Sequence, residues 1–242
     1  MKELSIDLEK LRQDNPNYVP REPFQPQKDA FSALSKIFTF PANGYKGGLL
    51  VLPTGAGKTF TAVNWICRNI LPKKMKVIWL AQSSYLLEQA SRAFSENALA
   101  IPYGRKSLNI RVVSSSPSQS KPATINTTDD VLIVTTQTAI KNFNITPEDL
   151  SGNKVETRFK EFVKSNINDG LFVVLDEAHH APAYGCRNLL SNMRNLIPNL
   201  YLLGLTATPT YTDKRTRGWL FKIFDQEIVF EAKKAGLIAQ DI

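Results

Sequence analysis

Short apolar segments alternate with helical stretches along most of this 242-residue chain, and this alternation restricts its fold more than any other feature. Continuous apolar runs, the pattern of strands buried on both faces, span residues 48–52, 76–81, 109–113, 131–135, 171–175 and 200–206. Helical spacing lies between them, over residues 58–70, 84–95, 137–143, 155–167 and 187–195. Such alternation is typical of a sheet covered by helices on both faces. We therefore predict an α/β fold with a mostly parallel β-sheet.

Three leucines near the N-terminus, Leu4, Leu8 and Leu11, have helical spacing. They predict a helix within residues 1–13, followed by an extended arm that prolines interrupt. We therefore divide the chain into an N-terminal helix and arm, residues 1–20, and one large domain, residues 21–242.

The remaining segments have weaker patterns. An amphipathic helix is predicted over residues 27–38, and another around Trp219. The tail predicts a strand over residues 228–230 and a short helix over 231–236 that a glycine closes. Residues 114–130 are poor in large apolar side chains, so we expect a mobile surface loop there.

The charge balance favours a polyanionic partner. Thirty Lys and Arg residues against 22 Asp and Glu give a formal net charge of +8, and phosphates bind such a surface with release of counterions. Only Cys67 and Cys186 are present, which indicates a reducing compartment, and we expect the cytoplasm. No signal peptide and no apolar run of about 18 to 20 residues is seen, so no membrane association is expected.

A glycine-containing loop follows the first predicted strand of the sheet and precedes a helix. Glycines there let backbone N–H groups turn toward a phosphate, and the helix N-terminus adds partial positive charge. Lys58 can reach the β- and γ-phosphates, and the Thr59 hydroxyl can bind Mg²⁺. The strict pattern has glycine where Leu52 stands. We predict a phosphate-binding loop formed by Thr54, Gly55, Ala56, Gly57, Lys58 and Thr59.

An acidic pair follows the buried strand of residues 171–175. Ligand sites in parallel sheets lie beyond the carboxyl ends of the strands, where Asp176 and Glu177 fall. Asp176 is predicted to hold Mg²⁺, and Glu177 to orient the water that attacks a γ-phosphate. Hydrolysis of this kind depends mainly on positioning and charge neutralisation.

Lys58, then Asp176-Glu177-Ala178-His179, then Thr206-Ala207-Thr208 follow one another in the chain. With them the chain resembles the first RecA-like domain of superfamily 2 helicases and translocases of the DEAH type. It is most similar to bacterial members from restriction and phage-defence systems, many of which also lack the first glycine of the loop. The resemblance implies an ATP- and Mg²⁺-dependent hydrolase. It also implies catalytic roles for Lys58, Asp176, Glu177 and His179. Thr206 and Thr208 would couple hydrolysis to movement.

The segment from Arg21 to Gln27 is similar to the family's adenine-reading segment. There a glutamine amide pairs with the adenine edge, and an aromatic ring such as Phe24, or an arginine, stacks on it. Gln25 and Gln27 compete for the amide role, and the position of Gln27 at a helix start favours it. The segment also reads as an ordinary polar start of a helix.

Hydroxyl and amide side chains follow two further strands and are similar to the family's nucleic-acid contacts. Ser83, Thr136 and Gln137 would bind phosphate oxygens without reading sequence. Ser and Thr after a strand are also common helix caps. The subfamily likeness favours DNA over RNA as the partner.

Motors of this family hydrolyse ATP between two RecA-like domains, and the second supplies arginines that are worth roughly 10³ to 10⁵ in rate. We expect no such second domain in this chain, so it should hydrolyse ATP slowly without one. Two other function classes stay open: a nucleotide-gated nucleic-acid-binding module without significant hydrolysis, and a small-molecule P-loop kinase.

Overall fold

A computed structural model describes residues 3–38, 44–143, 156–208, 214–225 and 228–232 of the chain. Their centre is one eight-stranded sheet with the order β1-β4-β5-β3-β6-β7-β2-β8. All pairs are parallel except β1 with β4, which is antiparallel. The strands are β1 Glu3–Asp7, β2 Lys46–Val51, β3 Lys76–Ala81, β4 Ser107–Val113, β5 Val131–Thr135, β6 Leu171–Leu175, β7 Leu200–Thr206 and β8 Ile228–Glu231.

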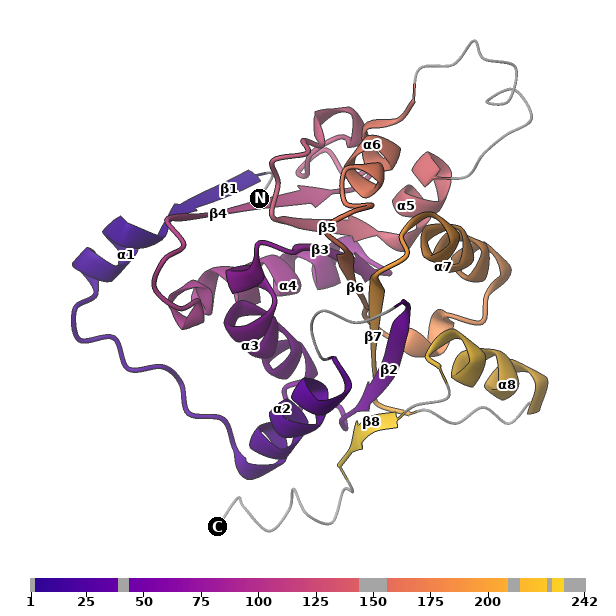
Figure 1. Ribbon diagram of the computed structural model, residues 1–242, viewed down its shortest axis with the longest axis horizontal. Coiled ribbons are helices and arrows are strands. Elements are labelled where there is room, and N and C mark those ends of the chain that lie inside the picture. Colours follow the sequence, from indigo (N-terminus) through magenta and orange to yellow (C-terminus); the bar gives the residue numbers. More distant parts are fainter. Residues whose placement is uncertain (1–2, 39–43, 144–155, 209–213, 226–227, 233–242) are drawn as a thin grey trace.

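Helices cover both faces of the sheet, as the sequence predicts (Figure 1). The helices α2, α3 and α4 lie on one side, and α5, α6, α7 and α8 lie on the other (Figure 1). The helix bounds are α1 Leu8–Asp14, α2 Gln25–Ile37, α3 Lys58–Asn69, α4 Ser84–Glu96, α5 Thr136–Phe143, α6 Arg158–Lys164, α7 Tyr184–Leu196 and α8 Lys214–Ile223. The predicted α/β class with a mostly parallel sheet is confirmed.

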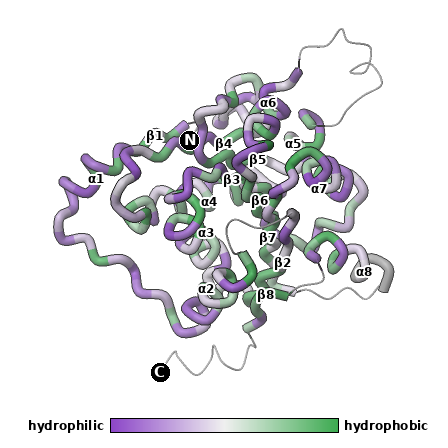
Figure 2. Tube along the Cα trace, viewed as in Figure 1, coloured by the Kyte–Doolittle hydropathy of each residue, from purple (hydrophilic) through white to green (hydrophobic). Residues whose placement is uncertain are grey.

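Two hydrophobic clusters, one on each face, hold the layers together. Alternate residues of β3 point to opposite faces, so Trp79 packs with the first cluster and Ile78 with the second. Figure 2 shows that the apolar residues concentrate in the central strands. Burial on both faces explains why these strands read as uninterrupted apolar runs in the sequence.

The predicted helix within residues 1–13 is wrong in its first half. Residues Glu3–Asp7 form an edge strand that pairs with β4, and the helix α1 begins only at Leu8. The Asp7 side chain caps α1 by accepting from the Lys10 N–H at 2.9 Å. The N-terminal segment is therefore part of the sheet.

The loop over residues 114–130 packs more closely than we expect from its composition. Gln119 and Asp129 are 1% and 2% exposed. The Asp129 carboxylate accepts two hydrogen bonds from the Arg111 guanidinium on β4, at 2.7 and 3.0 Å. Polar anchoring thus adds to the one large apolar side chain that the loop buries, Ile125 at 4% exposure.

The tail matches the prediction as far as it is described, since α8 and β8 occupy the predicted places. The helix predicted over residues 231–236 lies mostly outside the described residues. No helix within the described ranges is long and apolar enough to span a membrane.

Candidate functional site

The predicted phosphate loop connects β2 to α3 at the carboxyl edge of the sheet. Gly55 and Gly57 have φ angles of 85° and 78°, in the left-handed region that glycine adopts without steric cost. A Cβ atom added at Gly55 would meet no atom within 4 Å, so open space lies above the loop there. The loop is therefore an open turn that ends at the positive N-terminus of α3.

Gln27 connects the predicted adenine-reading segment to this loop. Its side chain is 4% exposed, accepts from the Phe24 N–H at 3.1 Å and donates to the Ala56 carbonyl at 3.2 Å. A Cβ atom on Gly57 would lie only 2.7 Å from Gln27 Nε2, so this contact requires glycine. Phe24 is 59% exposed and available for stacking. The adenine role of both residues stays a prediction, while Gln25 instead hydrogen-bonds Asp29.

Asp176 lies at the end of β6, almost fully buried at 4% exposure. Burial, and then the nearby charge of Glu177, raise the pKa of its carboxyl group to about 6. The Glu177 N–H, which donates to Asp176 Oδ1 at 3.0 Å, and the positive charge of Lys58 oppose this effect on the pKa. A carboxylate that the protein solvates this poorly is suited to a cation.

Glu177 has a left-handed backbone, with φ 51° and ψ 55°. This conformation is unusual for a residue with a side chain and costs of order 1 to 3 kcal/mol. His179 Nδ1 lies 3.3 Å from Glu177 Oε2. Burial, and then the neighbouring His180, lower the pKa of His179, which favours its neutral form. The site thus combines Glu177, whose backbone is strained, with the neutral imidazole of His179.

The Thr206 side chain joins the end of β7 to the turn that follows. Its hydroxyl donates to the Thr208 carbonyl at 3.0 Å and accepts from the Thr208 N–H at 3.2 Å. The Thr206 carbonyl in turn accepts from the Leu52 N–H at 3.1 Å, at the start of the phosphate loop. A shift of this turn would therefore be transmitted through Leu52 to the phosphate loop.

The strand order brings the predicted catalytic residues together. β6, β7 and β2 are consecutive neighbours in the sheet, so Asp176, Thr206 and Lys58 follow three adjacent strand ends at one edge. Within the described residues, no hydrogen bond or ion pair engages the Lys58 ammonium. The open loop, this ammonium and the buried carboxylate fit the phosphates of a nucleotide with its magnesium ion.

The three predicted nucleic-acid contacts differ in their accessibility. Ser83 is exposed but also caps α4, accepting from the Leu86 N–H at 3.4 Å. Gln137 is exposed, whereas Thr136 is 3% exposed and donates its hydroxyl to the Ala81 carbonyl at 3.3 Å. The buried Thr136 side chain therefore has a structural role. Ser83 and Gln137 are accessible to a partner.

Sequence reasoning missed one residue close to this site. The Arg21 guanidinium lies 4.8 Å from the centroid of the Phe60 ring, in the first turn of α3. The aromatic residue after Lys58-Thr59 in the sequence is the signal that could have indicated Phe60. Arg21 therefore packs on the helix that carries Lys58.

The sequence matches the model of a known protein family. A sequence model of the family described as type III restriction enzyme, res subunit, matches residues 21–211. No curated protein matches the sequence.

Solved structures share the fold at low sequence identity. The complex of a nuclease-deletion mutant of the type ISP restriction-modification enzyme LlaGI with a DNA substrate mimic has a TM-score of 0.56 and 20% identity, over 92% of this chain and 21% of that one. The Pyrococcus furiosus Hef helicase domain has a TM-score of 0.55 and 20% identity, over 82% and 35%. S. cerevisiae Dbp5, bound to RNA and ADP BeF3, has a TM-score of 0.58 and 18% identity, over 93% and 49%. This chain therefore has a RecA-like fold and spans about a fifth of the LlaGI chain and a third of the Hef chain.

Proposed function

Because this chain belongs to the family of type III restriction enzyme res subunits, we propose that it is the ATP-binding domain of a nucleic-acid-dependent ATPase, a helicase or translocase. One observation supports this proposal most strongly. The phosphate loop, the Asp176–Glu177 pair and Thr206 follow three adjacent strands of one sheet. A small-molecule kinase would need the loop but would have no need of the Thr206 link between loop and turn.

In this proposal, Thr54, Gly55, Ala56 and Gly57 wrap the phosphates of ATP with their backbone N–H groups. The Lys58 ammonium binds the β- and γ-phosphates, while Phe24 and Gln27 contact the adenine. Thr59 and Asp176 would hold Mg²⁺, which when bound would neutralise charge on the phosphate oxygens. Glu177 accepts a proton from the attacking water, and its fixed backbone orients the carboxylate.

His179, kept neutral, lies against the Glu177 carboxylate and limits its rotation. The Thr206–Thr208 turn connects the phosphate loop to the chain that follows β7. A shift of the phosphate loop on loss of the γ-phosphate would therefore be transmitted through this turn to the chain that follows β7. We assign the coupling of hydrolysis to movement to this pair of threonines.

Residues 21–242 would act with a second RecA-like domain, because the nucleotide site lies open at the edge of the sheet. Such a domain would supply arginines to the γ-phosphate and accelerate hydrolysis. The net charge of +8 and the exposed Ser83 and Gln137 support a nucleic-acid partner. We propose DNA rather than RNA, since the matching family is one of restriction enzymes.

Titration calorimetry with magnesium-ATP tests the site in this chain. We expect Lys58→Ala to weaken binding roughly 10- to 150-fold, the effect of a charge-assisted hydrogen bond to phosphate. Lys36→Ala removes an equal charge from the exposed side of α2 and should leave the affinity unchanged. Equal affinity of the Lys58→Ala variant and the wild-type chain would refute the proposed site.

Single-turnover hydrolysis, measured with nucleic acid and the second domain present, tests the enzyme assignment. Glu177→Gln should retain magnesium-ATP binding and lose hydrolysis, because only the water loses its proton acceptor. Unchanged hydrolysis in this variant would favour the nucleotide-gated binding module instead.

A further inference from the structure

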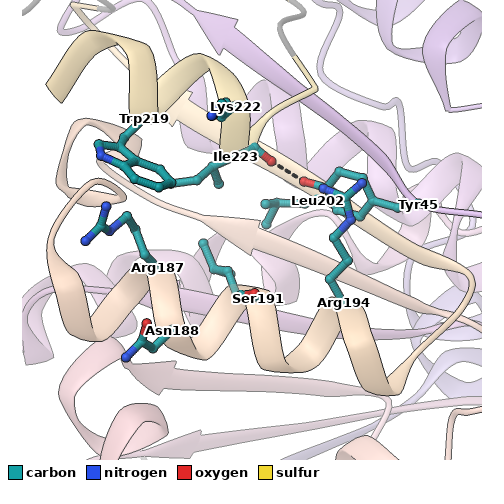
Figure 3. A pocket seen from close by; sticks show the side chains of 10 residues that line it. Tyr45, Arg187, Asn188, Ser191, Arg194, Leu202, Trp219, Lys222 and Ile223 are labelled. Carbon is teal, nitrogen blue, oxygen red and sulfur yellow. Dashed lines mark hydrogen bonds between the residues drawn. The ribbon is translucent and has the colours of Figure 1, made fainter. Parts of the chain in front are cut away.

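A second concave site lies on the face of the sheet away from α3. It is a pocket of about 510 Å³ between α7 and α8, a volume within the range of ligand sites. Figure 3 shows side chains from both helices, and from the residue before β2, turned toward one another around it. Its polar and aromatic lining includes Tyr45, Arg187, Ser191, Arg194, Trp219 and Lys222.

The three cations of this pocket have no carboxylate partner among the described residues. Instead, the Arg187 guanidinium lies 4.1 Å from the centroid of the Trp219 ring, and Lys222 Nζ lies 5.4 Å from it. The Arg194 guanidinium lies 3.9 Å from the centroid of the Tyr45 ring. Rings hold these groups in place but do not neutralise them.

Arg187 carries a second sign of a missing ligand. Its Nε atom is buried and has no hydrogen-bond partner in the described part of the chain. A guanidinium held against an indole, as Arg187 is, can still present N–H groups to a bidentate anion. Asp225 acts electrostatically on Tyr45, yet it makes no ion pair with any of the three cations.

The pocket is built into the fold. The Tyr45 hydroxyl donates to the Ile223 carbonyl at the end of α8 (Figure 3), and burial raises the pKa of this phenol, so it remains a donor. Arg187 and Arg194 are seven residues apart on α7, two turns or roughly 10 Å along its axis. The two guanidiniums thus flank a space with Ser191 between them.

A predicted nucleic-acid contact lies on α5, the helix that packs beside α7. α7 packs against α5, and a Cβ atom on Gly185 would lie 3.1 Å from Ile140 Cδ1. The exposed Gln137 lies in the first turn of α5. A strand bound at Gln137 could therefore continue over the start of α7 to Arg187 and Trp219.

We propose that this pocket binds single-stranded nucleic acid, with phosphates at Arg187 and Arg194 and a base on Trp219. This assignment rests on the proposed function, which supplies the partner. Cations interleaved with an accessible ring are typical of single-strand binding, because every base can stack. Trp219 is 38% exposed and offers such a ring. An acidic peptide would use the cations but would gain little from the indole.

Fluorescence anisotropy of a labelled oligothymidylate, titrated with the full chain at several salt concentrations, tests the phosphate contacts. The double variant Arg187→Gln, Arg194→Gln should lower the slope of log affinity against log salt by about 1.4, or 0.7 per contact. The matched double variant Lys10→Gln, Lys36→Gln removes the same charge from exposed positions on α1 and α2. Equal slopes for the two double variants would overturn the proposal.

The indole is tested separately. Trp219→Ala should weaken oligothymidylate binding roughly 5- to 150-fold, the effect of losing one stacked base. In the unaltered chain, Trp65 and Trp79 are 1% and 0% exposed, so acrylamide quenching reports Trp219. Oligothymidylate should protect this fluorescence. Equal protection by poly-glutamate at matched ionic strength would instead assign the pocket to acidic peptides and overturn the proposal.

Magnesium-ATP calorimetry on the same variants separates this proposal from the proposed function. Loss of oligonucleotide binding with unchanged ATP affinity supports the pocket. Oligonucleotide binding through Trp219 in a chain without ATP affinity would refute the ATPase assignment alone. ATP binding with an oligonucleotide affinity that does not depend on Trp219 would refute the pocket alone.

Discussion

Glu177 holds a backbone conformation that its residue type disfavours, at the position where the proposed chemistry needs a fixed carboxylate. Its φ of 51° is one of three positive values among the described non-glycine residues. The left-handed region costs an L-residue about 1 to 2 kcal/mol, a cost that glycine avoids. This strain gives a stability prediction that is independent of nucleotide.

We expect Glu177→Gly to be more stable than Glu177→Ala by about 1 kcal/mol, the reverse of their order in a helix. Both variants lack the carboxylate, so both should lose hydrolysis equally. Urea denaturation of the two proteins measures the difference. A more stable alanine variant would show that the turn relaxes at no cost.

Asp176 predicts a pH dependence of stability in metal-free protein. Its pKa of about 6 in the folded state exceeds the ordinary value of 3.8. Between these values the folded state keeps a proton that the unfolded chain has lost, so the free energy of unfolding falls as pH rises. Well above pH 6 the loss of stability is complete and amounts to roughly 3 kcal/mol, at 1.36 kcal/mol per pKa unit.

Asp176→Asn removes this titration and should stabilise the protein by up to about 3 kcal/mol near pH 8, with the gain vanishing near pH 4. Urea titrations with a chelator, at both pH values, check the result. A gain of equal size at both would mean that another interaction, and not the buried charge, is responsible.

At the scale of elements, β1 is connected to the loop after β4 through one buried guanidinium. Arg111, 6% exposed, donates to Asp129 at 2.7 and 3.0 Å and to Glu3 on β1 at 3.0 Å twice. Asp129 is buried, whereas the Glu3 side chain is 58% exposed. The two carboxylates therefore differ in what their removal leaves behind.

Asp129→Ala should cost on the order of 3 kcal/mol, because it leaves the Arg111 charge buried with only a solvated partner. Glu3→Ala should cost less than about 1 kcal/mol, since solvent screens that pair. Thermal or urea unfolding of both variants checks the order. Similar costs would show that β1 contributes more than its exposure indicates.

The sequence predicts the elements well where one physical cause dominates. β3, β5, β6 and β7 have the predicted bounds because burial on both faces leaves no polar interruption. β1 is an edge strand with one half-buried face. In the sequence, Leu4, Ile6 and Leu8 fit strand alternation as well as Leu4, Leu8 and Leu11 fit a helix, although Leu8 itself begins α1. Only pairing with β4 decides between the two.

The candidate site, like the fold, is predicted from the sequence only in part. The phosphate loop and the acidic pair are predictable because their function depends on neighbouring residues in the sequence. Composition does not show that Thr136 is buried, nor that Tyr45, Arg187 and Trp219 enclose one pocket. These facts depend on the strand order and on helix packing, which join segments far apart in the chain.

At the scale of the whole molecule, both edges of the sheet come from outside the region that the family matches. That region is residues 21–211, while β1 and β8 lie before and after it. Without them, β4 and the apolar strand β2 would become the edges. Unpaired edge strands are templates for association with other chains.

A chain trimmed to residues 21–211 should therefore aggregate, whereas one that keeps residues 3–232 should stay monomeric. Light scattering after size-exclusion chromatography distinguishes the two. A monomeric, folded short chain would show that the flanking strands do not protect the edges.

The place of β2 in the sheet also has a consequence for how the protein is made. Among the described strands, β2 pairs with β7 and β8 alone, and these emerge from the ribosome about 150 and about 180 positions later. Throughout that interval the strand that carries the phosphate loop has neither neighbour. Nucleotide therefore has no complete site to bind on a nascent chain and can act only after nearly all of the domain has been translated.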